Sequence, residues 1–135
     1  MSTLIYPAAF YVLYIFALFL SLMVVRVRAV KSGKVAMAYF ATYSGEGPPE
    51  WIVVLGRHYD NQFQVPLLFL LTCSVLMHAG VQDGLTQGLA WLFVASRLAH
   101  SWVHLRGNVV VRRLQAYALG WFTIVALWIR LLLAA

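Results

Sequence analysis

Basic and amide side chains recur beside the apolar segments of this sequence, where they could bind an anionic ligand. Arg57, Asn61 and Gln64 are spaced at i, i+4 and i+7, so a helix would place them on one face. They precede an apolar run that begins at Leu67. Because lipid cannot solvate such a face, we expect it to turn towards protein or a wet cavity.

A second polar group lies inside a later apolar segment. Arg97, His100 and His104 are spaced at i, i+3 and i+7 and therefore share a helix face. An arginine within a span is costly unless it faces protein or water. Arg113 and Tyr117 form a further i, i+4 pair. We expect both groups to converge with the first on one wet, positively charged pocket.

The composition indicates the solvent in which the chain folds. Of its 135 residues, 63% are apolar and 10% are charged, which is typical of an integral membrane protein. The net charge of +6 does not favour nucleic-acid binding, because the basic residues lie in short clusters near the ends of apolar segments. Cys73 is the single cysteine, which excludes an intramolecular disulfide and the thiol oxidoreductases that need a cysteine pair.

Four apolar segments are long enough to cross a bilayer, which requires about 20 residues. They cover residues 4–25, 62–80, 85–105 and 110–133. We therefore expect an all-α integral membrane protein, a four-transmembrane-helix bundle that forms one domain over residues 1–135. Residues 32–56 form the longest polar connection, and the glycines and prolines of residues 44–49 are typical of a turn, a mobile loop or a lid.

The histidines raise the alternative of a metal site. His100 and His104 have a helix spacing that could hold an ion, and only His58, Asp60 or Gln64 could complete the ligand set. No cysteine lies nearby, and Asp60 stands among arginines as an ion-pair partner. The sequence therefore favours an anionic ligand, and we expect no metal here.

With these residues in place, the sequence resembles the MAPEG family, the membrane-associated proteins of eicosanoid and glutathione metabolism, in a bacterial-type form. The second helix of that family typically opens with Arg, three residues, Asn, two residues and Glu, followed closely by Pro. Arg57, Asn61, Gln64 and Pro66 stand in those places. The resemblance covers nearly the whole chain as four spans in matching order.

Two further helices carry the same resemblance. The third-helix pattern Arg-x-x-His is present at Arg97 and His100. The family's fourth helix begins with an Arg that is followed four residues later by Tyr, as Arg113 and Tyr117 are here. Arg26 stands where the family has a basic residue at the end of the first helix.

The resemblance implies a homotrimer in which glutathione binds between subunits near the cytoplasmic face. A lipophilic substrate would reach the thiol from the bilayer, so the expected activity is that of a glutathione transferase or peroxidase. Arg113, with Tyr117, would stabilise the thiolate, which is the reactive form. The expected glutathione-binding residues are Arg26, Arg57, Asn61, Gln64, Arg97, His100 and His104.

Four positions differ from the glutathione-using pattern and keep other functions open. Asp60 stands where such members carry a basic residue, and Gln64 where they carry Glu. His104 stands where several carry Tyr, and Leu114 where some carry a hydroxyl residue. A non-catalytic lipid- or ligand-binding membrane protein of the same fold is the first alternative. A proton-coupled exporter is less favoured, because it needs an acid within a span and Asp60 lies at an interface.

The basic residues also predict how the chain is oriented in the membrane. They gather in connections 26–57 and 106–113, and none lies in the 79–86 turn or at the amino terminus. Basic connections stay in the cytoplasm, so we expect both termini in the periplasm of a bacterial inner membrane.

An alkaline phosphatase fused after Ala135 should be active and a green fluorescent protein fused there should be dark. A fluorescent fusion would contradict this topology.

Overall fold

The computed structural model of the protein describes residues 3–107 and 109–134, and over these residues the secondary structure is entirely helical. The predicted all-α class is therefore confirmed. In chain order the elements are α1 (Ile5–Lys31), α2 (Tyr39–Thr42), α3 (Glu50–Asp60), the 3-10 turn η1 (Asn61–Phe63), α4 (Val65–His78), α5 (Gly84–Arg106) and α6 (Val110–Ala134).

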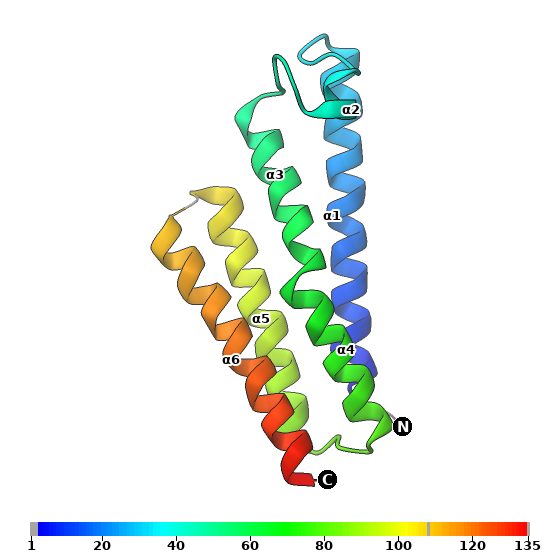
Figure 1. The fold of residues 1–135 in the computed structure, drawn as a ribbon, viewed down its shortest axis with the longest axis vertical. Coiled ribbons are helices and arrows are strands. Elements are labelled where there is room, and N and C mark those ends of the chain that lie inside the picture. The colour runs from blue at the N-terminus through cyan, green and yellow to red at the C-terminus, as the bar shows by residue number, and fades with distance from the viewer. Residues whose placement is uncertain (1–2, 108, 135) are drawn as a thin grey trace.

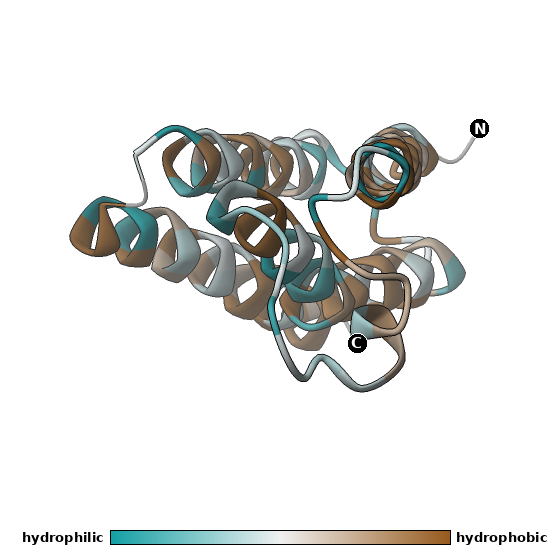
Figure 2. Ribbon diagram, turned by 90° about the horizontal axis from the view of Figure 1, so that it is seen from above, coloured by the Kyte–Doolittle hydropathy of each residue, from teal (hydrophilic) through white to brown (hydrophobic). Residues whose placement is uncertain are grey.

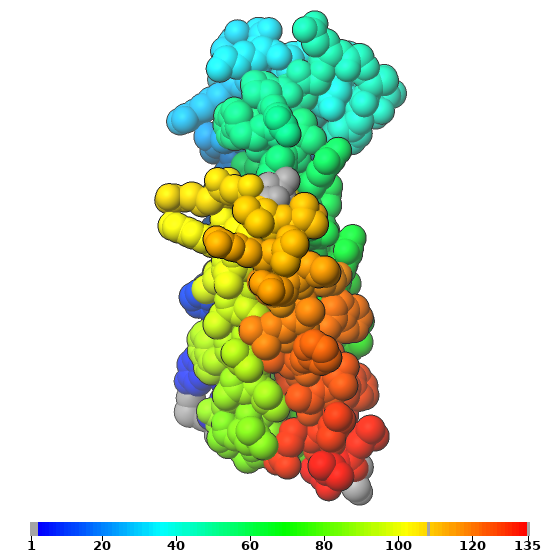
Figure 3. All heavy atoms as spheres, turned by 90° about the vertical axis from the view of Figure 1, so that its left-hand side faces the viewer, coloured from blue at the N-terminus to red at the C-terminus, as the bar shows by residue number. Residues whose placement is uncertain are grey.

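The long helices run side by side along the long axis of the molecule (Figure 1). They are α1, the succession of α3, η1 and α4, and the pair α5 and α6, which pack together along their length. The start of α1 and the end of α6 lie at the same end of the molecule (Figure 1). At the opposite end, α1, α2 and α3 project beyond α5 and α6, which cover the face seen in Figure 3.

Two of the described helices, α1 and α6, are long and apolar enough to cross a membrane by length and composition. Helix α4 has only 14 residues, but the chain continues at its start through η1 into α3. Apolar residues lie on outward as well as inward sides of the helices (Figure 2). For example, Leu13 of α1 is 67% exposed and Phe122 of α6 is 71% exposed. Such outward apolar faces need lipid or another subunit to cover them.

The connection after α1 is shorter than the sequence indicated. It was expected to reach residue 56, but α3 already begins at Glu50. Pro49 has no amide hydrogen to satisfy and stands at the N-cap of α3, and the Glu50 carboxylate lies near the positive end of the helix dipole. Ile52 is buried against Ala29, which fixes α3 to the end of α1.

The chain departs from helical geometry between α3 and α4. Gln64 has φ −105° and ψ −107°, and the following Pro66 lies in the first turn of α4, where no amide donor is needed. The predicted common face of Arg57, Asn61 and Gln64 assumed a continuous helix. The break separates Gln64 from the other two residues.

Aromatic side chains form the centre of the core. Tyr11 of α1, Phe69 of α4 and Phe93 of α5 are each fully buried. The rings of Phe69 and Phe93 stack with centroids 4.1 Å apart, and the Tyr11 ring packs against both. Leu127 joins this cluster from α6. Three helices thus meet around stacked rings, which bury a large apolar area.

Asp83 fixes the turn between α4 and α5. Its side chain accepts hydrogen bonds from the amides of Leu85 at 3.0 Å and Thr86 at 3.1 Å, and so caps α5. The guanidinium of Arg130 on α6 donates to the same carboxylate at 2.5 Å. The Thr86 amide and the Arg130 guanidinium together lower the pKa of Asp83 to about 2.

Replacing Asp83 by Asn should make stability depend on pH in a defined direction. Asn retains the cap but removes the charge that pairs with Arg130. Since the folded pKa lies below the ordinary value of 3.8, the charge stabilises the folded state above that pH and the benefit is lost as pH falls towards 2. The wild-type Tm in detergent should exceed that of Asp83→Asn at pH 7, and the gap should narrow below about pH 5.

The exposed loop residue Glu46 provides the control, because Glu46→Gln should leave Tm unchanged at every pH. A gap between wild type and Asp83→Asn that stayed constant from pH 7 to pH 3 would show that the ion pair does not contribute.

Candidate functional site

A cavity of about 570 Å³ lies between α3, η1, α5 and α6. Six of the nine predicted site residues line it, and we call it the cationic cavity. Its walls consist of Val54, Arg57, Asp60, Asn61, His100, His104, Val110, Arg113, Leu114 and Tyr117. Residues far apart in sequence are thus brought together, because α3 and α6 both pack against α5.

Two different helices supply the charges of the cationic cavity. Arg57 and Asp60 come from α3, and Arg113 comes from the first turns of α6. The Nδ1 atom of His100 donates a hydrogen bond to the backbone oxygen of Arg113 at 3.2 Å. This bond fixes the imidazole of α5 and holds the start of α6 beside it. Two guanidinium groups and one carboxylate therefore border the same space.

Arg26 lies in an adjoining cavity of about 360 Å³ that shares Arg57 and Asp60 with the first. Its guanidinium lies 5.1 Å from the ring centroid of Phe40. A Cβ atom at Gly56 would lie 3.0 Å from the Nη2 atom of Arg26. The glycine therefore gives the guanidinium room to lie against α3, within the same group of charges.

Arg97 is buried behind the wall of the cationic cavity. Its side chain is 2% exposed, and its guanidinium lies 4.9 Å from the ring centroid of Tyr117. The aromatic face of Tyr117 covers this guanidinium. The Nη1 atom of Arg97 has no hydrogen-bond partner among the described residues. Arg97 thus supports the cavity through Tyr117.

Gln64 is a predicted site residue that lies outside this arrangement. It is exposed and lines neither of the two cavities. The reason is the break between η1 and α4, which changes the direction of the chain at this residue. Asp60, three residues after Arg57 on α3, provides the acidic group beside the cavity instead of Gln64.

The structure adds His58 to the residues of the site. His58 is fully buried, although the sequence marked it only as a possible completing ligand. Gln62 lies one helical turn further along and contacts it. The Gln62 Nε2 atom donates to the backbone oxygen of His58 at 2.7 Å, and the Gln62 Oε1 atom accepts from the Tyr11 hydroxyl at 2.6 Å. The polar pair His58 and Gln62 at i, i+4 is the sequence signal that could have identified this inner face.

The helices and the cationic cavity define an all-helical protein with a polar, positively charged site between its helices. The family model described as MAPEG family matches residues 4–133, and the chain belongs to that family. This membership and the two apolar helices together indicate an integral membrane protein. Membership of the family also suggests a glutathione-related or similar function. No curated protein and no solved structure matches the chain.

The contact between Arg97 and Tyr117 predicts a difference between two substitutions. Tyr117→Phe keeps the aromatic face under the buried guanidinium, whereas Tyr117→Leu removes it. A desolvated cation–π contact contributes about 2 kcal/mol, so the Leu variant should be less stable than the Phe variant by about 1–2 kcal/mol. Denaturant unfolding of the detergent-solubilised protein measures this difference.

Trp102 provides a matched control on the same helix as Arg97. The guanidinium of Arg106 lies 4.1 Å from its ring centroid, and both side chains are exposed. Trp102→Leu should cost less than Tyr117→Leu, because exposed cation–π contacts are weaker. Equal losses in the Phe and Leu variants of Tyr117 would show that the hydroxyl, not the ring, is important.

Proposed function

We propose that the protein is a membrane-embedded glutathione-dependent transferase or peroxidase that acts on a lipophilic electrophile. One observation carries the proposal: Arg57 and Arg113 from separate helices border the same cavity as Asn61 and His100. An anionic ligand with several polar groups suits such a cavity, and glutathione is the ligand that the family suggests.

The charges of glutathione match the charges around the two adjoining cavities. Glutathione carries two carboxylates, one ammonium group, amides and a thiol. Arg57 and Arg26 would bind the carboxylates through paired, charge-assisted hydrogen bonds. Asp60, which borders both cavities, would face the ammonium group. Asp60 would thus supply the acidic group that glutathione-using members have as Glu at the position of Gln64.

Arg113 would stabilise the thiolate, with the Tyr117 hydroxyl as a second donor. Both line the cationic cavity. A decrease of about two units in the thiol pKa requires about 2.7 kcal/mol, which one poorly solvated guanidinium can supply. The thiolate would then add to an electrophilic carbon–carbon double bond, so that a C–S bond forms, the π bond breaks and the resulting carbanion takes a proton from water. With a lipid hydroperoxide, the thiolate would attack the terminal oxygen, the O–O bond would break and the lipid alcohol would leave after protonation. A second glutathione would reduce the glutathione sulfenic acid to the disulfide and water. Val110 and Leu114 give the same cavity an apolar wall for such a substrate.

The assembly that best suits this chemistry is a homotrimer of four-transmembrane-helix subunits. Large apolar side chains are exposed on α1 and α6, and lipid or a neighbouring subunit would cover them. Gln64 is exposed on the protomer, so it would contact glutathione only at a subunit boundary. We place this bacterial-type protein in the inner membrane with both termini in the periplasm.

A thiolate assay tests the proposal directly. Glutathione added to the detergent-purified protein should produce the ultraviolet absorbance of a thiolate, near 240 nm. Arg113→Ala should reduce this signal roughly tenfold or more, because the thiol pKa returns towards its ordinary value. Arg112→Ala is the matched control: Arg112 is exposed on the same turn and does not line the cavity, so its loss should leave the signal intact.

Two outcomes separate the proposal from its main alternative. Glutathione binding without a thiolate, or a co-purified lipid detected by native mass spectrometry with no thiolate, would favour a non-catalytic binding protein of the same fold. Neither binding nor thiolate formation in the wild type would overturn the glutathione proposal.

A further inference from the structure

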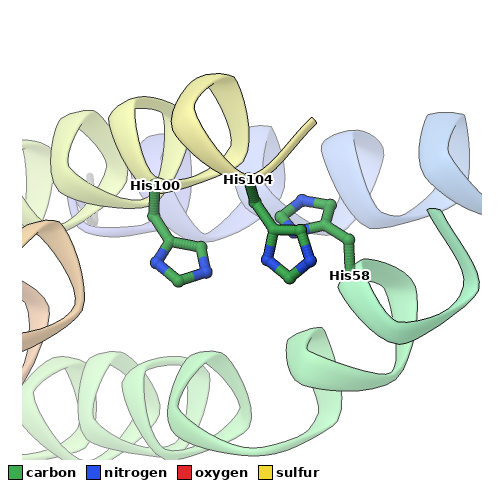
Figure 4. A group of neighbouring side chains, drawn as sticks. All are labelled: His58, His100 and His104. Carbon is green, nitrogen blue, oxygen red and sulfur yellow. The ribbon is translucent and has the colours of Figure 1, made fainter. Parts of the chain in front are cut away.

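Three buried histidines form a cluster between α3 and α5. His58 comes from α3, and His100 and His104 come from successive turns of α5, with all three rings directed into the same space (Figure 4). One ring nitrogen from each residue lies within 4.8 Å of the other two. The side chains are 0%, 3% and 5% exposed, respectively. We call this cluster the histidine triad.

Each ring of the histidine triad keeps one nitrogen that has no hydrogen-bond partner among the described residues. These atoms are the Nδ1 of His58, the Nε2 of His100 and the Nδ1 of His104. A buried polar atom without a partner destabilises a protein by about 1–3 kcal/mol, and folded proteins seldom retain three in one place without a reason. A bound ligand would satisfy all three together.

The hydrogen bonds of His100 show which of its nitrogens can bind a ligand. Its Nδ1 lies 3.2 Å from the backbone oxygen of Arg113, and a carbonyl oxygen only accepts. Nδ1 therefore carries the proton. In the neutral ring Nε2 then has a free lone pair, and this atom is buried without a hydrogen-bond partner among the described residues. A backbone carbonyl that holds the second nitrogen is the usual support of a metal-binding histidine.

A hydrogen-bond relay assigns the ring of His58 in the same way. Ser101 donates to the backbone oxygen of Arg97 at 2.8 Å, so its hydroxyl oxygen accepts the proton of the neighbouring Tyr14 hydroxyl. The Tyr14 oxygen then accepts from the Nε2 of His58 at 3.2 Å. The Gln62 amide nitrogen lies further from Nε2, at 3.4 Å, which is long for a hydrogen bond, whereas it donates to the His58 carbonyl oxygen at 2.7 Å. The Nδ1 of His58 therefore keeps its lone pair.

We propose that the histidine triad binds one zinc-type divalent transition-metal ion. Three imidazoles are the ligand set of open zinc sites, in which a fourth position remains for water or another ligand. Tetrahedral zinc would bring the nitrogens to about 3.4 Å from one another, so small ring rotations from the present spacing complete the site. Hard ions such as Mg²⁺ prefer oxygen ligands, which the triad lacks.

The fourth position of this ion would open to the cationic cavity, because His100 and His104 line that cavity as well. Arg57 and Arg113 lie on its other walls. An ion that adds two positive charges there should hold an anion, such as hydroxide, chloride or a thiolate, in its open position. The metal proposal stands independently of the glutathione proposal, since its evidence is the geometry of the three rings.

Metal retention by the full-length protein tests the inference. The protein is purified in detergent without a histidine tag, stripped with a chelator, loaded with ZnSO₄ and desalted. Elemental analysis should then find about one zinc per subunit. Cobalt loaded in place of zinc should give the visible absorption of a tetrahedral Co²⁺ site, and excess Mg²⁺ should not displace either ion.

Substitutions within and outside the triad identify the ligands. His58→Gln and His104→Gln should each weaken zinc binding at least tenfold, because two imidazoles remain. His78→Gln is the matched control: His78 is the fourth histidine of the chain and is exposed at the end of α4, so retention should be unchanged. A Tm measured without metal confirms that each variant is folded.

The wild type alone decides the question if a triad variant fails to fold. Clearly substoichiometric zinc in the wild type, or a Co²⁺ spectrum identical to that of the free aqueous ion, would overturn the proposal. If His78→Gln retains as much zinc as the wild type and the triad variants lose it, the metal proposal is supported. Thiolate formation does not enter these measurements, so the outcome is separate from that of the glutathione assay.

Discussion

The burial of the Arg97 guanidinium is the constraint on which the rest of the structure depends. Removing a charge from water costs several kcal/mol unless nearby groups compensate for it. Tyr117 covers one face of this guanidinium at 4.9 Å. Gly120 allows α6 to approach, because a Cβ there would lie only 3.4 Å from Arg97 Nη1 and 3.2 Å from Ser96 Oγ. The close pairing of α5 and α6 is therefore matched to the cation between them.

The polar groups of the cationic cavity lie towards the end of the molecule opposite the start of α1 and the end of α6 (Figure 1). The half of the core nearer the termini contains the fully buried rings of Tyr11, Phe69 and Phe93. Beyond Arg97 towards the other end, His58, His100 and His104 are buried between α3 and α5. Tyr14 and Ser101 connect the two regions by hydrogen bonds across α1 and α5. Apolar packing thus holds the helices together at one end, while the cationic cavity lies towards the other.

The helix periodicity of α5 and α6 correctly indicated residues that line one cavity, whereas that of the second predicted span did not. The spacing of His100, His104, Arg113 and Tyr117 correctly placed all four around one cavity. These residues lie on uninterrupted helices, so the 3.6-residue period applies. Gln64 lies where the helix breaks, and its phase relative to Arg57 is lost. Helix periodicity cannot predict the relative positions of residues on the two sides of such a break.

The sequence by itself determined the helical class, the membrane-like composition and which helix faces are polar, because these follow from local spacing and hydropathy. Only the tertiary structure decided which residues from different helices lie next to one another. It buried His58 beside His104, although the two are separated by 46 positions in the chain, and it directed their rings into the same space as that of His100. That meeting depends on how α3 packs against α5. Packing is set by side-chain shape and buried area across the whole bundle, and local spacing does not encode it.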